Sequence, residues 1–299
     1  FIINSDFFHI KCRNFSYGPV GRVGIRTDEW GIVWKKTNPG YHGNIIKNPL
    51  EKWEDLEKYI FPDPLDYWRW DLEDLKKLIE IGREQGKYIM TYVGNFFEKM
   101  QWLRGFVNIL IDIEENQERI KILGDKLLNY LMKTTEKFGY LGIDGVMFAD
   151  DWGTQQSLMI NPNKWRELFK PYYKELFKKA HENNLDVHFH TDGNTLEIIP
   201  DLIEIGADVL KLPVPLMIKA KLSKVVKNKV CIRTDIDRQY MLREANYIEM
   251  LDCIREICDK MGSSKGGIIG CGEVNEDCSL EAVEAMYDGF EKFGNYKKK

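Results

Sequence analysis

The sequence predicts an α/β protein, and within that class a closed (β/α)8 TIM barrel formed by a single domain. Short apolar segments alternate with amphipathic segments over most of the chain, and at least six such pairs follow one another with short connections. Strand–helix alternation is typical of parallel sheets covered by helices. No linker rich in Gly, Pro or Ser divides the 299 residues, which favours one closed barrel over a doubly wound sheet.

The predicted strands share one pattern, in which four to seven apolar residues give way to polar residues and glycine at the C-terminal end. Continuous rather than alternating hydrophobicity is typical of strands that are buried on both faces. The segments with this pattern are YIMTYVG (88–94), GVMFADDWG (145–153), DVHFHTDGN (186–194), DVLKLPVP (208–215), VCIRTDID (230–237) and GGIIGCGE (266–273).

Between the predicted strands lie amphipathic segments with apolar residues at helical spacing, and these predict helices. The segments cover residues 71–85, 161–184, 197–205 and 244–261. The second of them opens with NPNKW, in which an asparagine directly before a proline is a helix-start signal.

The first 64 residues are predicted to decorate the barrel, whose core spans residues 65–299. The segment GRVGIRTDEWGIVWKKT (21–37) alternates apolar and polar residues and predicts a hairpin. The segment EKWEDLEKYIFPDP (51–64) predicts a short helix ended by prolines. Because the chain opens with FIINSDFF and without methionine, we expect some N-terminal sequence to be missing.

Composition argues against several classes of partner. A formal charge of −4 does not suit nucleic acid, whose phosphates require a basic surface. The chain has no apolar run of 18 residues and no signal peptide, so we expect a soluble, cytoplasmic protein without a membrane partner. The cysteines form no CxxC pair, so we expect reduced thiols, one of them available as a metal ligand: Cys12, Cys231, Cys253, Cys258, Cys271 and Cys278.

Polar side chains follow four of the predicted strands where each strand ends. In a barrel, the reactive groups lie at the C-terminal ends of the strands, so we expect these side chains to converge. They are Asp150, Asp151 and Trp152 after one strand, His190, Asp192 and Asn194 after the next, Arg233, Asp235 and Asp237 after a third, and Cys271 and Glu273 after the last.

Several of these residues also have a structural interpretation. His188 lies in mid-strand and is expected in the core, whereas His190 lies one pleat nearer the rim. Asp192 stands before a glycine and could cap the next helix through an Asx turn. Cys271, between two glycines, could be a small buried thiol. Asp150 and its neighbour Asp151 cannot both be buried at low cost, so at least one is expected to face the cavity.

Two kinds of chemistry suit this set of residues. One imidazole, one thiolate and one carboxylate at a similar height can hold Zn²⁺ with an open fourth position, and the metal then acts as a Lewis acid. Alternatively, paired carboxylates and an arginine could hold an anionic substrate while His190 moves a proton without any metal.

The same segments carry a resemblance to a known family. The motifs FADDWGT, NPNKWRELFKPYYKELFKKAHE, VHFHTDGN, IIPDLIEIGADVL, TDIDRQYML and GGIIGCGEVNED resemble the uroporphyrinogen decarboxylase superfamily over about residues 50 to 290. The resemblance is closest to its corrinoid-dependent branch, the methylcobamide:coenzyme M methyltransferases. It implies a (β/α)8 barrel, in agreement with the strand and helix pattern.

The methyltransferase branch carries a His-x-Cys-Gly motif and a later cysteine that together bind zinc. His190 falls on the histidine, Asp192 on the first cysteine and Cys271 on the second, so the resemblance implies Zn²⁺ bound by these residues. A carboxylate in place of a thiolate leaves the metal more electrophilic. This change suits activation of an oxygen-linked methyl group, as in an aryl methyl ether.

The resemblance therefore predicts a zinc-assisted methyltransferase that moves a methyl group between a small methyl donor or acceptor and a corrinoid (cobalamin) on a corrinoid-binding partner protein. We expect Asp150, Asp151 and Glu273 to orient the substrate or move a proton. The expected substrate contacts are Tyr92, Trp152, Arg233 and Asp235.

Two other functions remain open at this stage. The first is a metal-independent decarboxylase, in which Asp150 and Arg233 bind an acidic substrate. The second is a barrel that has lost its chemistry and only binds a ligand or partner. Three departures from the family pattern favour it: the aspartate at position 192, Thr234 where the family often has glycine, and Val214 where it usually has glutamine.

Overall fold

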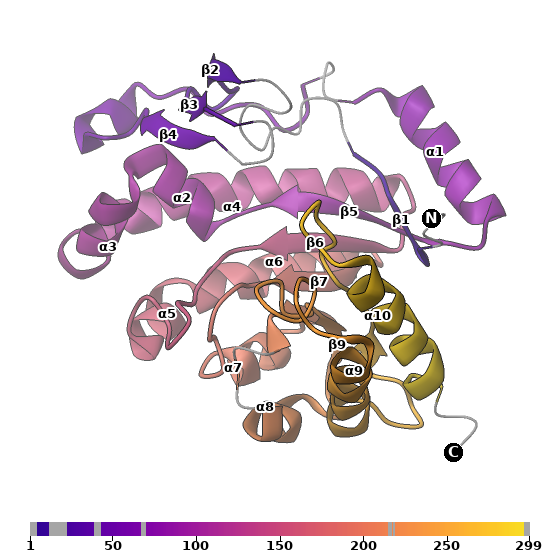
Figure 1. Ribbon diagram of the computed structural model, residues 1–299. Helices are drawn as coiled ribbons and strands as arrows, with labels where there is room; N and C mark the ends of the chain where they lie inside the picture. Colours follow the sequence, from indigo (N-terminus) through magenta and orange to yellow (C-terminus); the bar gives the residue numbers. More distant parts are fainter. Residues whose placement is uncertain are drawn as a thin grey trace. The chain divides into compact units, whose positions relative to one another are not determined.

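The computed structural model describes residues 5–11, 23–38, 43–66, 70–214, 217 and 219–295 (Figure 1). It divides into two compact units. The first comprises Phe1–Phe148 and Pro171–Leu185, and the second comprises Ala149–Lys170 and Asp186–Lys299. The predicted split into a decoration up to residue 64 and a core after it stays a prediction.

The first unit contains a parallel sheet with the order β1-β5-β6, formed by β1 (Phe7–His9), β5 (Tyr88–Gly94) and β6 (Gly145–Ala149). Phe7 pairs with Tyr88, and Met90 pairs with Gly145. The helices of this unit are α1 (Leu72–Glu84), α2 (Phe97–Arg104), α3 (Phe106–Glu115), α4 (Gln117–Tyr140) and α6 (Lys170–Glu182). Their apolar faces are buried, as the amphipathic pattern requires.

A three-stranded antiparallel sheet in the first unit confirms the predicted hairpin, although residues 21 and 22 lie outside the described residues. Its strands are β2 (Gly24–Thr27), β3 (Val33–Lys36) and β4 (Asn44–Lys47). Asp28 shapes the turn, because its Oδ1 accepts the backbone N–H groups of Trp30 and Ile32 at 2.9 and 3.0 Å. The predicted short helix is the 3-10 helix η1 (Trp53–Glu57).

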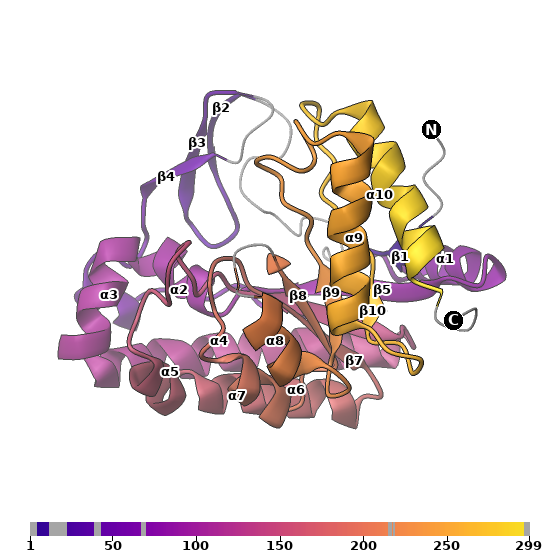
Figure 2. The ribbon, with the colours of Figure 1, turned by 60° about the horizontal axis from the view of Figure 1, so that its bottom comes forward.

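The second unit contains a parallel sheet with the order β7-β8-β9-β10. Its strands are β7 (Asp186–His190), β8 (Val209–Leu212), β9 (Cys231–Thr234) and β10 (Ile268–Ile269). The helices are α5 (Pro162–Leu168), α7 (Ile199–Glu204), α8 (Lys219–Val226), α9 (Tyr247–Met261) and α10 (Leu280–Phe293). The last two helices lie side by side (Figure 2).

The helix predicted over residues 161–184 is interrupted. Asn161 caps its start by accepting the N–H of Asn163 at 2.8 Å, as the NPNKW signal predicts. The helix then breaks at Phe169 into α5 and α6. Pro171 explains the break, since proline has no N–H to donate to the carbonyl four residues earlier.

The predicted fold class is confirmed as α/β with a TIM-barrel-like arrangement of parallel strands and helices. The described residues contain seven parallel strands, one fewer than a closed (β/α)8 barrel requires, so the complete barrel is not observed. Among the helices of the described ranges, none has the length and apolar composition needed to cross a membrane.

Candidate metal centre

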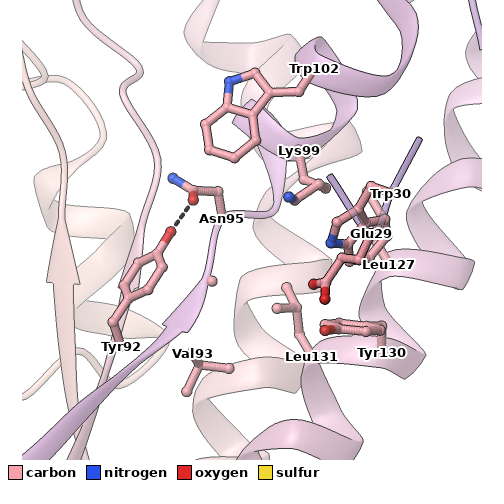
Figure 3. A pocket seen from close by; sticks show the side chains of 11 residues that line it. Glu29, Trp30, Tyr92, Val93, Asn95, Lys99, Trp102, Leu127, Tyr130 and Leu131 are labelled. Carbon is pink, nitrogen blue, oxygen red and sulfur yellow. Dashed lines mark hydrogen bonds between the residues drawn. The ribbon is translucent and has the colours of Figure 1, made fainter. Parts of the chain in front are cut away.

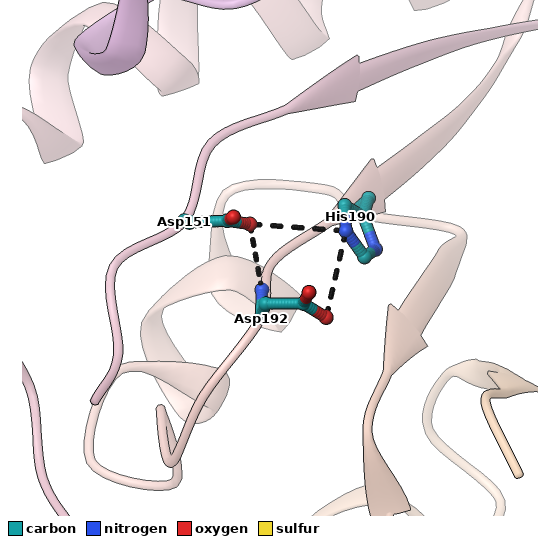
Figure 4. A group of neighbouring side chains, drawn as sticks. All are labelled: Asp151, His190 and Asp192. Atoms are coloured by element: carbon teal, nitrogen blue, oxygen red, sulfur yellow. Dashed lines mark hydrogen bonds and ion pairs between the residues drawn. The ribbon is translucent and has the colours of Figure 1, made fainter. Parts of the chain in front are cut away.

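Three side chains of the second unit meet where strands end. Asp151 follows β6, His190 is the last residue of β7, and Asp192 lies two residues further on (Figure 4). His190 Nε2 lies 3.7 Å from Asp151 Oδ1 and 3.6 Å from Asp192 Oδ1. Each of the three residues offers one potential ligand atom, and these atoms all lie within 4.8 Å of one another. The three side chains are therefore close enough to share one metal ion.

Backbone hydrogen bonds fix the two segments that carry this group. The N–H of Asp150 donates to the carbonyl of His190 at 3.0 Å, and the N–H of Gly153 donates to the carbonyl of Asp192 at 3.1 Å. The N–H of Asp192 also donates to Asp151 Oδ1 at 3.0 Å. These hydrogen bonds between the two loops fix the backbone positions from which the two carboxylates and the imidazole project.

Burial shifts the pKa of two members of the group. It raises the pKa of Asp151 to about 6, with a further contribution from the neighbouring charge of Asp192. Burial also lowers the pKa of His190 to about 4, and the nearby ammonium of Lys211 acts in the same direction. The imidazole is therefore neutral at pH 7, which is the form that binds a metal.

Two cations and two further carboxylates surround the group. Lys211 Nζ lies 3.3 Å from the buried carboxylate of Asp235. Arg238 donates to Asp192 Oδ2 at 3.2 Å and to Glu273 Oε2 at 2.6 Å. The neighbourhood thus has four carboxylates, Asp151, Asp192, Asp235 and Glu273, but two cations, Lys211 and Arg238.

The group fits a divalent metal on three grounds. When all four carboxylates are ionised, the surplus is two negative charges, and one divalent cation balances it. Asp192 Oδ1 is buried without a hydrogen-bond partner. Two donors that each lie ~2.1 Å from a tetrahedral ion are ~3.4 Å apart, close to the observed separations.

Cys271, the third zinc ligand implied by the resemblance, lies outside this donor group. Its backbone N–H donates to Thr234 Oγ1 at 3.1 Å, and its carbonyl accepts from the same hydroxyl at 3.2 Å. Thr234 therefore ties the segment after β10 to the end of β9. The third member of the donor group is Asp151, which is expected from the sequence to act on substrate or proton. The metal-binding role of Cys271 and the catalytic role of Asp151 stay predictions.

Other predicted site residues are partly or fully buried. Trp152 is fully buried and packs edge-to-face on Trp165 and Phe169, with ring centroids 6.1 and 4.7 Å away. Asp150 is also fully buried, and Arg233 on β9 is half-buried. Their predicted roles, together with the role of Asp235, stay predictions. His188 is buried, as expected from its place in mid-strand, and Cys12 lies outside the described residues.

Tyr92, a predicted substrate contact, belongs to the first unit, where it lines a small aromatic cavity of about 30 Å³ (Figure 3). Its hydroxyl donates to Asn95. The ammonium of Lys99 lies over the rings of Trp30 and Trp102, 4.6 and 4.5 Å from their centroids. The predicted contact of Tyr92 with a substrate stays a prediction.

Sequence reasoning missed Lys211 and Arg238. Lys211 does leave a signal, because it is a charged residue inside the otherwise apolar strand segment DVLKL. Arg238 leaves none, since it stands in a turn among other polar residues. Asp237 shapes that turn by accepting the N–H groups of Gln239 and Tyr240 at 2.8 and 3.3 Å.

The fold and site define an α/β protein of the TIM-barrel type with a histidine and two carboxylates at the ends of its strands. The chain belongs to the uroporphyrinogen decarboxylase family, whose model, described as "Uroporphyrinogen decarboxylase (URO-D)", matches residues 38–293. Among curated protein sequences, no significant match is found.

Similar folds occur among solved structures. A methyltransferase from Methanosarcina mazei is 17% identical with a TM-score of 0.68, over 89% of this chain and 76% of that one. A D-psicose 3-epimerase is 10% identical with a TM-score of 0.49, over 76% of this chain and 86% of that one. At 17% identity, the likeness to the methyltransferase shows the fold alone.

Proposed function

We propose that this chain is a methyltransferase that moves a methyl group between a small methylated substrate and a corrinoid carried by a partner protein, with the assistance of a bound divalent metal, expected to be Zn²⁺. The observation that carries the proposal is the group of Asp151, His190 and Asp192 at the strand ends. Membership of the uroporphyrinogen decarboxylase family and the similar fold of a methyltransferase support the reaction type.

The residues of the group have separate tasks in this proposal. His190 offers a neutral nitrogen, and Asp192 offers an oxygen that accepts no hydrogen bond. Asp151 supplies the third donor, in place of Cys271. A divalent ion held there would supply Lewis-acid catalysis by drawing electron density from the oxygen that leaves the methyl carbon.

In the proposed direction the carbon–oxygen bond of the substrate breaks and its electron pair stays on oxygen. The methyl carbon accepts its new electron pair from the reduced corrinoid of the partner. The leaving oxygen needs a proton, which Asp150, a predicted catalytic carboxyl group, would deliver. Glu273, the other one, accepts a hydrogen bond from Arg238 and would help to orient the site. An aryl methyl ether is a suitable substrate, because a phenolate oxygen is a stable leaving group.

Metal removal tests this function. We expect the purified protein to contain about one Zn²⁺ per chain and to form methylcobalamin from reduced cobalamin and a methoxylated aromatic compound. A chelator should abolish the reaction, and added Zn²⁺ should restore it, because the metal activates the leaving oxygen. Three protein donors leave the fourth position of the ion open for that oxygen. Elemental analysis and the change in cobalamin absorbance measure both results. Full activity in a metal-free preparation would contradict the proposal.

A metal-independent decarboxylase is the second candidate, favoured by the family name and by the contact of His190 Nε2 with Asp151 Oδ1. An imidazole and a carboxyl group joined through one water molecule can also act as an acid–base pair. Here Asp150 and Arg233 would bind an acidic substrate. Release of CO2 from a carboxylated tetrapyrrole, unaffected by a chelator, would favour this candidate over methyl transfer.

A further inference from the structure

Arg238 connects the candidate metal centre to a residue outside it. Its Nη2 donates to Asp192 Oδ2 at 3.2 Å, and its Nη1 donates to Glu273 Oε2 at 2.6 Å. Asp192 follows β7, Arg238 follows β9, and Glu273 follows β10. One guanidinium therefore joins the segments that follow three strands of the second unit.

This contact gives the two oxygens of Asp192 different surroundings. Oδ2 accepts from Arg238, whereas Oδ1 is buried without a hydrogen-bond partner and lies 3.6 Å from His190 Nε2. A quarter-turn about the last side-chain bond of Asp192 would break the contact with the guanidinium. Arg238 thus fixes the plane of the carboxylate so that one of its two equivalent oxygens faces the imidazole.

Glu273 keeps the guanidinium itself in place. Its contact with Arg238 is the shorter of the two, and charge-assisted contacts between arginine and carboxylates have a strong geometric preference. Asp192 and Glu273 together also neutralise the arginine, so Arg238 offers no surplus positive charge to an anionic substrate. Its geometry suits a supporting role better than substrate binding.

We infer that Arg238 is a positioning residue, which holds Asp192 in the orientation that binds the metal and is itself held by Glu273. The inference rests on the proposed metal centre. Outer partners that orient metal-binding carboxylates typically change metal affinity by roughly 10- to 100-fold when they are removed. A lysine at this position keeps the charge but lacks the planar fork that reaches two carboxylates.

Titration of Zn²⁺ into the metal-stripped protein tests the inference. We expect Arg238→Gln to weaken Zn²⁺ binding by roughly 10- to 100-fold and Arg238→Lys to weaken it less. Glu273→Gln should also weaken binding, and it should add little in the Arg238→Gln background, because Glu273 acts through the arginine. The matched control is Arg243→Gln: Arg243 also pairs with a carboxylate, Asp277, and its side chain is similarly exposed, 47% against 43% for Arg238. This control should bind Zn²⁺ like the unchanged protein.

The results separate the inference from the proposed function. Unchanged or tighter Zn²⁺ binding in Arg238→Gln, with normal binding by the parent protein, overturns the positioning role alone. Equal effects of Arg238→Gln and Arg243→Gln overturn it as well, since they would reflect a general change of charge. A parent protein that binds no Zn²⁺ overturns both. The expected binding pattern without any methyl transfer supports the positioning role and contradicts the proposed function.

Discussion

Replacement of His190 by alanine is expected to abolish metal binding and methyl transfer. The imidazole is the one nitrogen donor of the group, and its Nε2 lies within 3.7 Å of both carboxylates. Without it, two carboxylates face each other, and the burial that already raises the pKa of Asp151 favours a shared proton over a metal. We expect Zn²⁺ affinity to fall by more than about 100-fold, beyond the loss typical of an outer partner.

Elemental analysis after dialysis measures the metal content of the His190→Ala variant. The exposed His181 on α6 provides a control, because His181→Ala removes an imidazole that does not belong to the donor group. Thermal unfolding should show that both variants are folded. A His190→Ala variant that keeps one Zn²⁺ per chain would show that the metal is bound elsewhere.

Replacement of Gly193 by alanine is expected to destabilise the protein and to disrupt the same site. Gly193 has φ +81°, and a Cβ there would lie 2.2 Å from the backbone carbonyl of Gly153. Neither backbone can yield without separating the loops that carry Asp151 and Asp192. Conformational strain and overpacking each cost about 1–3 kcal/mol, so we expect the free energy of unfolding to fall by about 3 kcal/mol or more.

The Gly266→Ala variant measures the cost of backbone strain alone, without the steric clash that a Cβ would cause at Gly193. Gly266 also has a positive φ, +95°, but a Cβ there meets no atom within 4 Å. Chemical denaturation of both variants should show a loss of about 1 kcal/mol for Gly266→Ala, from strain alone, and a larger loss for Gly193→Ala. Zn²⁺ binding should fall in Gly193→Ala and remain in Gly266→Ala. Equal losses of stability would show that the contact with Gly153 contributes nothing.

Local pattern was sufficient to predict most strands and helices. The six predicted strands are all present, because a continuous apolar run ended by polar residues leaves few alternatives to a buried strand. Local pattern did not predict the interruption of the 161–184 helix, because the apolar periodicity favours one continuous helix whereas Pro171 favours a break. It also could not show closure of a barrel, since closure depends on strand pairings far apart in the sequence.

The candidate site was predictable in position but less so in composition. Strand ends place His190, Asp192 and Asp151 at one edge, and the sequence shows where strands end. The resemblance assigned the third donor to Cys271, whereas the backbone bonds between the loops after β6 and β7 bring Asp151 to the group. Arg238 was not predictable, because its contact with Asp192 depends on the turn that Asp237 forms.

The most direct test of the metal centre is an anomalous diffraction map, recorded at the zinc edge from crystals of the protein with Zn²⁺ bound. We predict one peak within ~2.2 Å of His190 Nε2 and of an oxygen of both Asp151 and Asp192. A peak bound by Cys271 without Asp151, or no peak beside His190 at full Zn²⁺ occupancy in solution, would contradict the account.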